Sequence, residues 1–479
     1  MRRTPLLLAA LLCATPAAAQ RDCRIVDIAP TGYARNLAGP GGTNIIFVSG
    51  PLEVHCGTDV IIRADSAHNT GRELRLVRDV FYQDSTQTLT SEMATYERDI
   101  GRVTARGDVV VRDRASPSVV RGTELTYDRE MPNRPETRIV VRGRPRAYLY
   151  EEGAPMLPPG MEPSPGMRIV DGDTIPGALQ VDADRLELQG EGRILAHGRV
   201  QMIREDVRAF GDAADYDRTA GRMDLTGSAR IEGRGYELFG DRITASLAEE
   251  ELERVLSEGN AMLVGEDIDV RAPVIDIRLA AGEVERMIAV ARRPDVQARA
   301  VARDFTLTAD SIQADAPASE LERITAVGRA HGERAPDSAS AALPELIRSD
   351  WLRGDTIVAT FARLEPAAGD TTEGTTADTA RTELETLTAT GSARALYRMA
   401  SADEETTESA VNYILATQIS LRMRGDEVAT VNTIGPVEGV HLEPVRRVGA
   451  PEAGEGGGDA DSDDDDGSAS GTAAQEGHR

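Results

Sequence analysis

The chain has 479 residues, of which 40% are hydrophobic and only 4% are aromatic. Its formal net charge of −26 argues against a nucleic-acid partner, because binding to a phosphate backbone requires a basic surface. Beyond the N-terminal residues, no segment of the sequence is apolar enough to cross a membrane as a helix.

Segment 1–19 has the features of a secretory signal peptide. Arg2 and Arg3 supply the positive charge at its start, an apolar run follows, and three alanines at 17–19 provide the small residues of a cleavage site. The apolar run is too short to span a bilayer. We therefore expect a soluble mature protein that is exported to the periplasm.

Removal of the signal peptide would leave two cysteines, Cys23 and Cys56. An even pair in an oxidising compartment favours one disulfide, which would tie an N-terminal lead segment (20–43) onto the first strands. Two free thiols are the alternative.

A strand–turn–strand unit recurs from Asn44 to about Leu442. In its clearest copy, 212–231, the second strand has apolar residues or glycine on one face and polar residues on the other, as expected for a half-buried strand. A turn with Asp217 and Gly221 separates the two strands. Repetition of this kind predicts a stacked, all-β architecture of antiparallel strands.

A glycine recurs in the middle of the repeated strands, on their apolar face. We expect a crease there, where each strand bends and the opposite walls come too close for a side chain. Partner strands carry a small residue before an acid at the matching place, and their disturbed alternation indicates a β-bulge. About 20 such strands, at roughly 4.8 Å spacing, would form a stack on the order of 95 Å long. The glycines are Gly50, Gly107, Gly143, Gly198, Gly227, Gly259, Gly328, Gly391 and Gly435, and the small-acid pairs are Ala64-Asp65, Ser91-Glu92, Ala183-Asp184, Gly211-Asp212, Gly240-Asp241, Ala309-Asp310 and Gly354-Asp355.

The repeats predict two arrays separated by a region of different composition. The first array covers 44–150, and a Pro/Gly-rich loop or linker covers 151–178. The second array covers 179–447, and a disordered acidic tail covers 448–479.

No motif in the sequence points to catalysis, a metal or a cofactor. The six histidines are scattered without zinc-ligand spacing, and nucleophile, phosphate-binding and dinucleotide-binding motifs are missing. Acidic residues recur in every copy, which indicates a role in the geometry of the repeat. We expect a non-enzymatic protein without a cofactor.

The inner face of a creased sheet would be lined mainly by aliphatic side chains. Such a lining suits alkyl chains, which require apolar volume and no directed polar partner. From this pattern alone, two readings stay open: a lipid-binding trough, or a structural scaffold of the cell envelope with a closed β-solenoid core.

The strand–turn–strand units at 88–113 and around 211–231 resemble the LptA/OstA family of lipopolysaccharide-export proteins, also called the organic-solvent-tolerance-like N-terminal domain. The shared pattern is a small residue and an acid, an apolar residue, Tyr and an acid, a turn, Gly-Arg, and an Ala-x-Gly strand. It is matched at 91–111 and again at 211–231. The resemblance implies an elongated, open β-jellyroll (β-taco) whose apolar groove shields lipopolysaccharide acyl chains during export to the outer membrane.

The resemblance also implies partners and a lining for the groove. Members stack edge to edge with one another, with an LptC-like inner-membrane component and with an LptD-like outer-membrane barrel. This chain is longer than a single bridging subunit and has no large C-terminal barrel. On this reading we expect the acyl chains to contact Val103, Val109, Val111, Ile194, Val200, Met202, Leu225, Ile231 and Leu263.

Overall fold

The computed structural model describes residues 23–444, apart from 40–43, 152, 171–172, 191, 234, 249–250, 266–267, 303, 318–319, 337–343, 364–381, 400–408 and 426. The predicted signal peptide (1–19) and acidic tail (448–479) lie outside these residues. The described chain forms one sheet of 28 strands and a separate two-stranded hairpin. The prediction of an all-β fold of repeated antiparallel strands is therefore confirmed.

The strands follow one another along the chain with short connections. The N-terminal strands are β1 (Cys23–Ile28), β2 (Tyr33–Ala38), β3 (Asn44–Cys56), β4 (Val60–Asn69), β5 (Glu73–Gln83), β6 (Gln87–Glu97), β7 (Arg102–Asp113), β8 (Val119–Asp128), β9 (Arg138–Arg142) and β10 (Arg146–Leu149). The middle strands are β11 (Arg168–Val170), β12 (Asp173–Ile175), β13 (Leu179–Asp182), β14 (Arg185–Gln189), β15 (Arg193–Arg204), β16 (Val207–Asp217), β17 (Arg222–Gly233), β18 (Tyr236–Ala248), β19 (Glu251–Gly265) and β20 (Asp269–Ala280). The C-terminal strands are β21 (Glu283–Val290), β22 (Ala298–Ala302), β23 (Phe305–Ala309), β24 (Ser311–Asp315), β25 (Arg323–Arg334), β26 (Trp351–Arg363), β27 (Thr382–Met399), β28 (Ala410–Arg424), β29 (Glu427–Ile434) and β30 (Glu438–Leu442). Two short 3-10 helices, η2 (Arg98–Ile100) and η5 (Glu345–Ile347), lie in connections.

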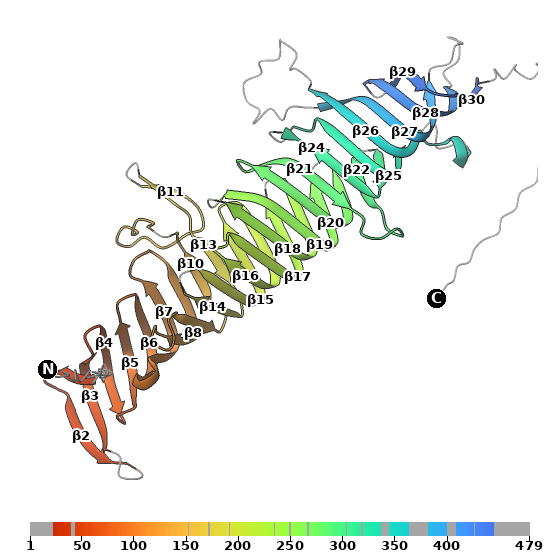
Figure 1. Cartoon of the computed structure of the whole chain (residues 1–479). Coiled ribbons are helices and arrows are strands. Elements are labelled where there is room, and N and C mark those ends of the chain that lie inside the picture. The colour runs from red at the N-terminus through yellow and green to blue at the C-terminus, as the bar shows by residue number, and fades with distance from the viewer. Residues whose placement is uncertain are drawn as a thin grey trace, which may run out of the picture.

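The large sheet is a simple meander of antiparallel strands, in which each full crossing of the sheet pairs with the next one along the chain. Six pairs of short strands are each one strand interrupted at its middle: β1/β2, β9/β10, β13/β14, β21/β22, β23/β24 and β29/β30. The 28 strands therefore make 22 crossings of the sheet. At about 4.8 Å per crossing, the sheet is about 100 Å long, and Figure 1 shows this elongated body with β2–β4 at one end and β28–β30 at the other.

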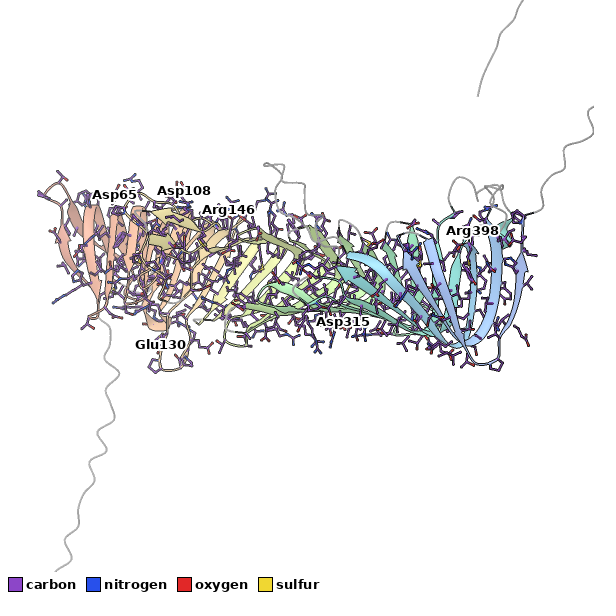
Figure 2. All side chains as sticks on the ribbon, turned by 90° about the horizontal axis from the view of Figure 1, so that it is seen from above. Asp65, Asp108, Glu130, Arg146, Asp315 and Arg398 are labelled. Carbon is purple, nitrogen blue, oxygen red and sulfur yellow. A yellow bond between two sulfur atoms is a disulfide. The ribbon has the colours of Figure 1, made fainter. Side chains whose placement is uncertain are left out.

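The interruptions and bends divide the sheet into two walls. We call the wall that starts with β1 and ends with β30 wall 1, and the wall that starts with β2 and ends with β29 wall 2. The strands bend from one wall to the other along a line that we call the crease. The turns between strands lie on the two opposite margins, and we call the side between these margins the mouth. In Figure 2, Asp65 and Asp108 of the crease lie on one long side of the N-terminal section, and Glu130 of a turn lies on the other.

At the crease, two consecutive residues of the bending strand have left-handed backbone conformations. The glycine has φ between +73° and +81° at seven positions, and the residue after it has φ between +40° and +58°. The strand pairing shifts register at these residues, for example between Thr226 and Ala229 of β17. The predicted crease and bulge are therefore present: Gly227 and Ser228 of β17 lie opposite the single residue Asp241 of β18, and β17 keeps the same face turned inward on both walls.

The reason for the glycine differs from the predicted one. A side chain at this position would collide with the acid of the neighbouring strand, not with the opposite wall. A Cβ atom would come within 2.2–2.5 Å of a carboxylate oxygen in the pairs Gly107–Glu92, Gly198–Asp184, Gly227–Asp212, Gly259–Asp241, Gly328–Asp310 and Gly391–Asp355. The acid in turn accepts hydrogen bonds from the residue after the glycine in several copies, as Asp310 does from Arg329 at 3.0 Å. The repeated acids thus belong to the geometry of the crease.

Gly227→Ala is expected to destabilise the protein by more than Gly235→Ala does. Both glycines have left-handed backbones, with φ of +76° and +73°, but the Gly227 Cβ would meet the side chain of Asp212 while that of Gly235 would meet open space. The left-handed backbone alone costs an alanine about 1–2 kcal/mol, and the clash adds to this at Gly227. Urea titrations of the two variants measure the difference in unfolding free energy. Equal losses would contradict the role assigned to the acid.

The sheet is more extensive than the two arrays predicted from the sequence. Strands β1 and β2, in the predicted lead segment, pair with both halves of β3 and form the first crossing. The sheet also continues across 151–178, because β10 pairs with β13. Segment 151–178 is an insertion at the margin of wall 1, and its strands β11 and β12 form a hairpin that stands off the body (Figure 1). A loop at the margin interrupts no backbone pairing, so the flanking strands β10 and β13 remain neighbours in the sheet.

Cys23 and Cys56 are joined by a disulfide, with their Cα atoms 4.0 Å apart. They are directly paired in the antiparallel register of β1 and β3. The bond closes a chain separation of 33 residues at the N-terminal edge of the sheet. It therefore fixes an edge strand that has a single neighbour among the described strands.

The outer face of wall 2 carries cross-strand ion pairs. Arg193 lies 2.8 Å from Asp215, Arg254 lies 2.7 Å from Asp276, and the guanidinium of Arg286 lies 2.6 Å from Asp315. Opposite charges on neighbouring strands stabilise a sheet modestly and keep its outer surface hydrated. The charged residues are thus outside and the aliphatic residues inside, which is the amphipathic sheet that the period-2 pattern predicts.

Among the described residues, no helix is long and apolar enough to cross a membrane.

Candidate functional site

The inner faces of the two walls form one continuous hydrophobic cluster. It begins at Val48 on β3 and extends to Leu421 on β28, over nearly the whole length of the sheet. Valine, leucine and isoleucine dominate its N-terminal part, and tyrosines lie near the mouth. This interior is the candidate functional site.

The nine residues predicted to line a lipid groove all belong to this interior. Val103 (β7), Ile194 (β15) and Leu225 (β17) are on wall 2, whereas Val109 and Val111 (β7), Val200 and Met202 (β15), Ile231 (β17) and Leu263 (β19) are on wall 1. Eight of them are at most 6% exposed, and Leu263 is partly buried against the same cluster. The side chains of the two walls therefore fill the space between them in this structure.

Polar residues close the mouth in the N-terminal section of the sheet. Arg129, just after β8 at the margin of wall 2, reaches across to two acids at the margin of wall 1. Its Nε donates to Asp84 at 3.0 Å, and its Nη2 donates to Asp59 at 2.5 Å. Arg129 is 5% exposed and Asp84 is 1% exposed, so this ion pair is buried. We call Asp59, Asp84 and Arg129 the clasp.

Two tyrosines add hydrogen bonds to the clasp. Tyr82 of wall 1 and Tyr127 of wall 2 both donate their hydroxyl protons to Asp84 Oδ2, at 3.0 and 2.9 Å. The other oxygen of Asp84 accepts the backbone N–H groups of Thr86 and Gln87. The Tyr82 ring packs edge-on against Tyr127, with centroids 6.2 Å apart, and lies 6.0 Å from Tyr96. The tyrosine rings and the charged side chains of the clasp, which come from both walls, thus cover the hydrophobic interior at the mouth.

The clasp shifts the protonation equilibria of its members. Burial raises the pKa of Asp84, but hydrogen bonds from Gln87, Thr86 and Tyr127 and the charge of Arg129 outweigh burial, so that its pKa is lowered overall. Burial and the nearby carboxylate of Asp84 raise the pKa of Tyr127 to a point where the hydroxyl stays protonated. The charged carboxylate and neutral phenols are therefore the forms that fit the hydrogen bonds.

The local sequence pattern does not predict the clasp. Tyr-acid pairs lie at 96–97, 127–128 and 216–217, at the ends of β6, β8 and β16. Tyr96 and Tyr127 are indeed buried at strand ends, and Asp217 accepts the backbone N–H of Ala220 in its turn. Arg129 and Asp84 are 45 residues apart in the chain, and no local pattern joins them. The sequence feature that could have indicated the clasp is Asp84. It is an acid at an inward-facing position, two residues after the inward-facing Tyr82.

The mouth has a different composition from about Tyr216 onward. Several inner side chains near the margins are apolar and only partly buried there. On wall 2 these include Met223, Leu279, Val284, Ile324, Phe361 and Leu384, and on wall 1 Leu263, Ile268, Phe305 and Met399. A cavity of about 610 Å³ opens at the margin of wall 2, between β24, β25 and β26. Phe361 and Leu321 line it together with Asp315, Glu320, Arg323 and Arg363.

No grouping of His, Cys, Asp or Glu in the described parts of the chain could hold a metal ion. The buried polar residues of the clasp are paired with one another and with tyrosines, in a structural arrangement across the mouth. The physical effect that this interior can exert is the burial of apolar surface.

Residues 170–251 match the model of the family described as LptA/(LptD N-terminal domain) LPS transport protein. This segment runs from the β11–β12 hairpin to the start of β19, and it includes five of the nine predicted lining residues.

Among solved structures, one similar chain is LptH from Pseudomonas aeruginosa, described as the LptA homologous periplasmic component of the conserved lipopolysaccharide transport device. It is 16% identical, the alignment covers 30% of this chain and 92% of that chain, and the TM-score is 0.21. The comparison with curated proteins gives no match.

Proposed function

We propose that this protein is a periplasmic carrier of lipopolysaccharide, whose acyl chains lie between the two walls of the sheet during export to the outer membrane. The observation that carries the proposal is the hydrophobic cluster that joins both walls from Val48 to Leu421. The match of residues 170–251 to a lipopolysaccharide-transport family supports the same ligand.

The proposed mechanism is burial of alkyl surface without a chemical reaction. Each methylene group removed from water contributes about 0.8 kcal/mol. Because the walls are in contact, a lipid has to part them and replace contacts between walls with contacts between walls and lipid. Both kinds of contact are apolar, so the exchange has a small net free energy. A lipid can then pass along the interior between similar environments.

The ends of the sheet are the proposed places for partners. Among the described strands, β1 and β2 pair only with β3, and β29 and β30 pair only with β28. An edge strand with one neighbour presents unpaired backbone groups to an added strand. An LptC-like inner-membrane component, an LptD-like outer-membrane barrel or a second copy of this chain would add its strand there.

A second candidate function is a structural scaffold of the cell envelope with a closed core. The specific observation that favours it is the packing of the interior, in which Val103, Val109, Val200 and Leu225 are at most 2% exposed. The scaffold would bind no lipid, and this difference separates the two functions.

Mass spectrometry of lipids extracted from the protein, purified from its native envelope, tests the proposal. We expect lipid A species to accompany the wild-type chain. Leu263→Glu should lower their amount by at least about tenfold, because a carboxylate facing acyl chains is poorly solvated. The matched control is Ile169→Glu, since Ile169 is 77% exposed on β11, in the hairpin that stands off the body. Wild-type protein free of lipid, or equal lipid in the two variants, would favour the scaffold.

A further inference from the structure

The interior is divided into two sections that differ at the mouth. In the section from β3 to β9, which we call the closed section, the inner side chains are buried right up to the margins, as in Leu74, Tyr82, Leu89 and Tyr96. In the section from β17 to β28, which we call the loading section, several side chains near the margins are only partly buried, as in Met223 and Leu263, whereas Leu238, Val270 and Leu352 are buried.

The clasp accounts for the closed section. Arg129 and Tyr127 come from wall 2 and meet Asp84, Asp59 and Tyr82 of wall 1, so that these walls are joined by hydrogen bonds as well as by apolar contact. Parting the walls here would separate the Asp84 carboxylate from the Arg129 guanidinium and the Tyr127 hydroxyl, and Arg129 from Asp59. Such a loss strongly opposes opening.

The loading section has an interior that opens more easily. Its inner faces carry many alanines, which have less surface to bury between the walls than the valines, leucines and tyrosines of the closed section. The buried alanines on β22–β28 include Ala300, Ala314, Ala330, Ala359, Ala389 and Ala395. Less apolar surface is therefore exposed when these walls part.

A cavity at the mouth of the loading section combines the two kinds of surface that an amphiphile requires. Its apolar residues, Leu321 and Phe361, belong to the partly buried set that packs against the interior. Its charged residues are Asp315, Glu320, Glu322, Arg323 and Arg363, and Arg363 lies 2.8 Å from Glu320. An acylated lipid with a polar head could place its first methylene groups against Phe361 while its head stays at the charged rim.

We infer that acylated lipid with a polar head enters the interior through the mouth of the loading section, and that the closed section stays shut during loading because of the clasp. This inference rests on the proposed function. It assigns the uptake site to the part of the mouth between β17 and β28 and places Val103, Val109 and Val111 behind the closed mouth. The clasp thus limits how far a newly loaded lipid extends along the interior between the two walls.

Photo-cross-linking in the full-length mature chain tests this inference. The photoreactive residue p-benzoylphenylalanine replaces Phe361 or Phe305 in the loading section, or Tyr96 in the closed section, and purified lipopolysaccharide is the probe. All three replacements exchange one aromatic ring for another. We expect strong adducts at Phe361 and Phe305, and at least tenfold less adduct at Tyr96.

A second variant examines the clasp itself. Asp84→Asn keeps the size of the side chain and removes the charge, and it should raise the adduct at Tyr96 without changing the adduct at Phe361. Equal adducts at Tyr96 and Phe361 in the intact protein would overturn the inference and leave the proposed function in place. Adducts at Phe361 together with no rise at Tyr96 in Asp84→Asn would show that the clasp does not close the section. The lack of adducts at all three positions would instead contradict the proposed function.

Discussion

Replacing Asp84 with Ala is expected to destabilise the closed section by about 3–5 kcal/mol, the range observed when one partner of a buried ion pair is removed. The substitution leaves Arg129 with Asp59 as its remaining charged partner in the clasp and leaves the hydroxyl groups of Tyr82 and Tyr127 without their acceptor. Hydrogen exchange of the β4–β8 amides measures the effect. Protection should fall by about 10²–10⁴-fold, since each 1.4 kcal/mol is a factor of ten.

The matched control for this prediction is Arg75→Ala on the same strand as Tyr82. Arg75 pairs with Glu73 at 3.0 Å, but its side chain is 59% exposed, so its loss should change stability by less than about 1 kcal/mol. Similar exchange rates in Asp84→Ala and Arg75→Ala would contradict a structural role for the clasp.

The pH dependence of the closed section follows from the same carboxylate. The pKa of Asp84 is lower in the folded protein than its ordinary value, so its contribution to stability is present above pH of about 4 and is lost as the pH falls further. In Asp84→Asn this part of the acid sensitivity should disappear. The same hydrogen-exchange measurement at a series of pH values below 5 gives the comparison.

Much of the fold could be predicted from the sequence, because its determinants are local and repeated. The period-2 pattern identifies which side chains face inward, and the pairing of each glycine with a small-acid step locates the crease. The purpose of the glycine could not be read correctly, since Gly227 and Asp212 come together only when two strands pair in register. The sequence pattern gives the positions of residues within one strand, whereas the collision involves residues of two neighbouring strands.

The state of the interior could not be predicted from the pattern. An aliphatic inward face is compatible with an open groove and with a packed core, because both require the same residues. The difference depends on what lies at the mouth, where Arg129 and Asp84 meet across 45 residues of sequence. Likewise, the Pro/Gly-rich composition of 151–178 predicts a loop but does not reveal that β10 and β13 remain paired across it.

The second large effect that we expect is a change in wall separation when lipid is loaded. The inner side chains of Leu225, Ile243 and Ile275 are fully buried, so the interior has no room for an acyl chain while the walls touch. One layer of hydrocarbon between two surfaces adds about 4 Å, the contact distance between carbon atoms. The margins of the loading section should therefore move apart by at least that amount, and those of the closed section should not.

Distances between spin labels across the mouth, measured with and without purified lipopolysaccharide, test this claim most directly. Labels at Asp269 and Glu283 report on the loading section, and labels at Ser85 and Asp99 report on the closed section. These four side chains are exposed, and each pair has one member at each margin. We predict that lipopolysaccharide lengthens the first distance by about 4 Å or more and leaves the second unchanged. A first distance that stays the same at saturating lipopolysaccharide would contradict a lipid-carrying interior.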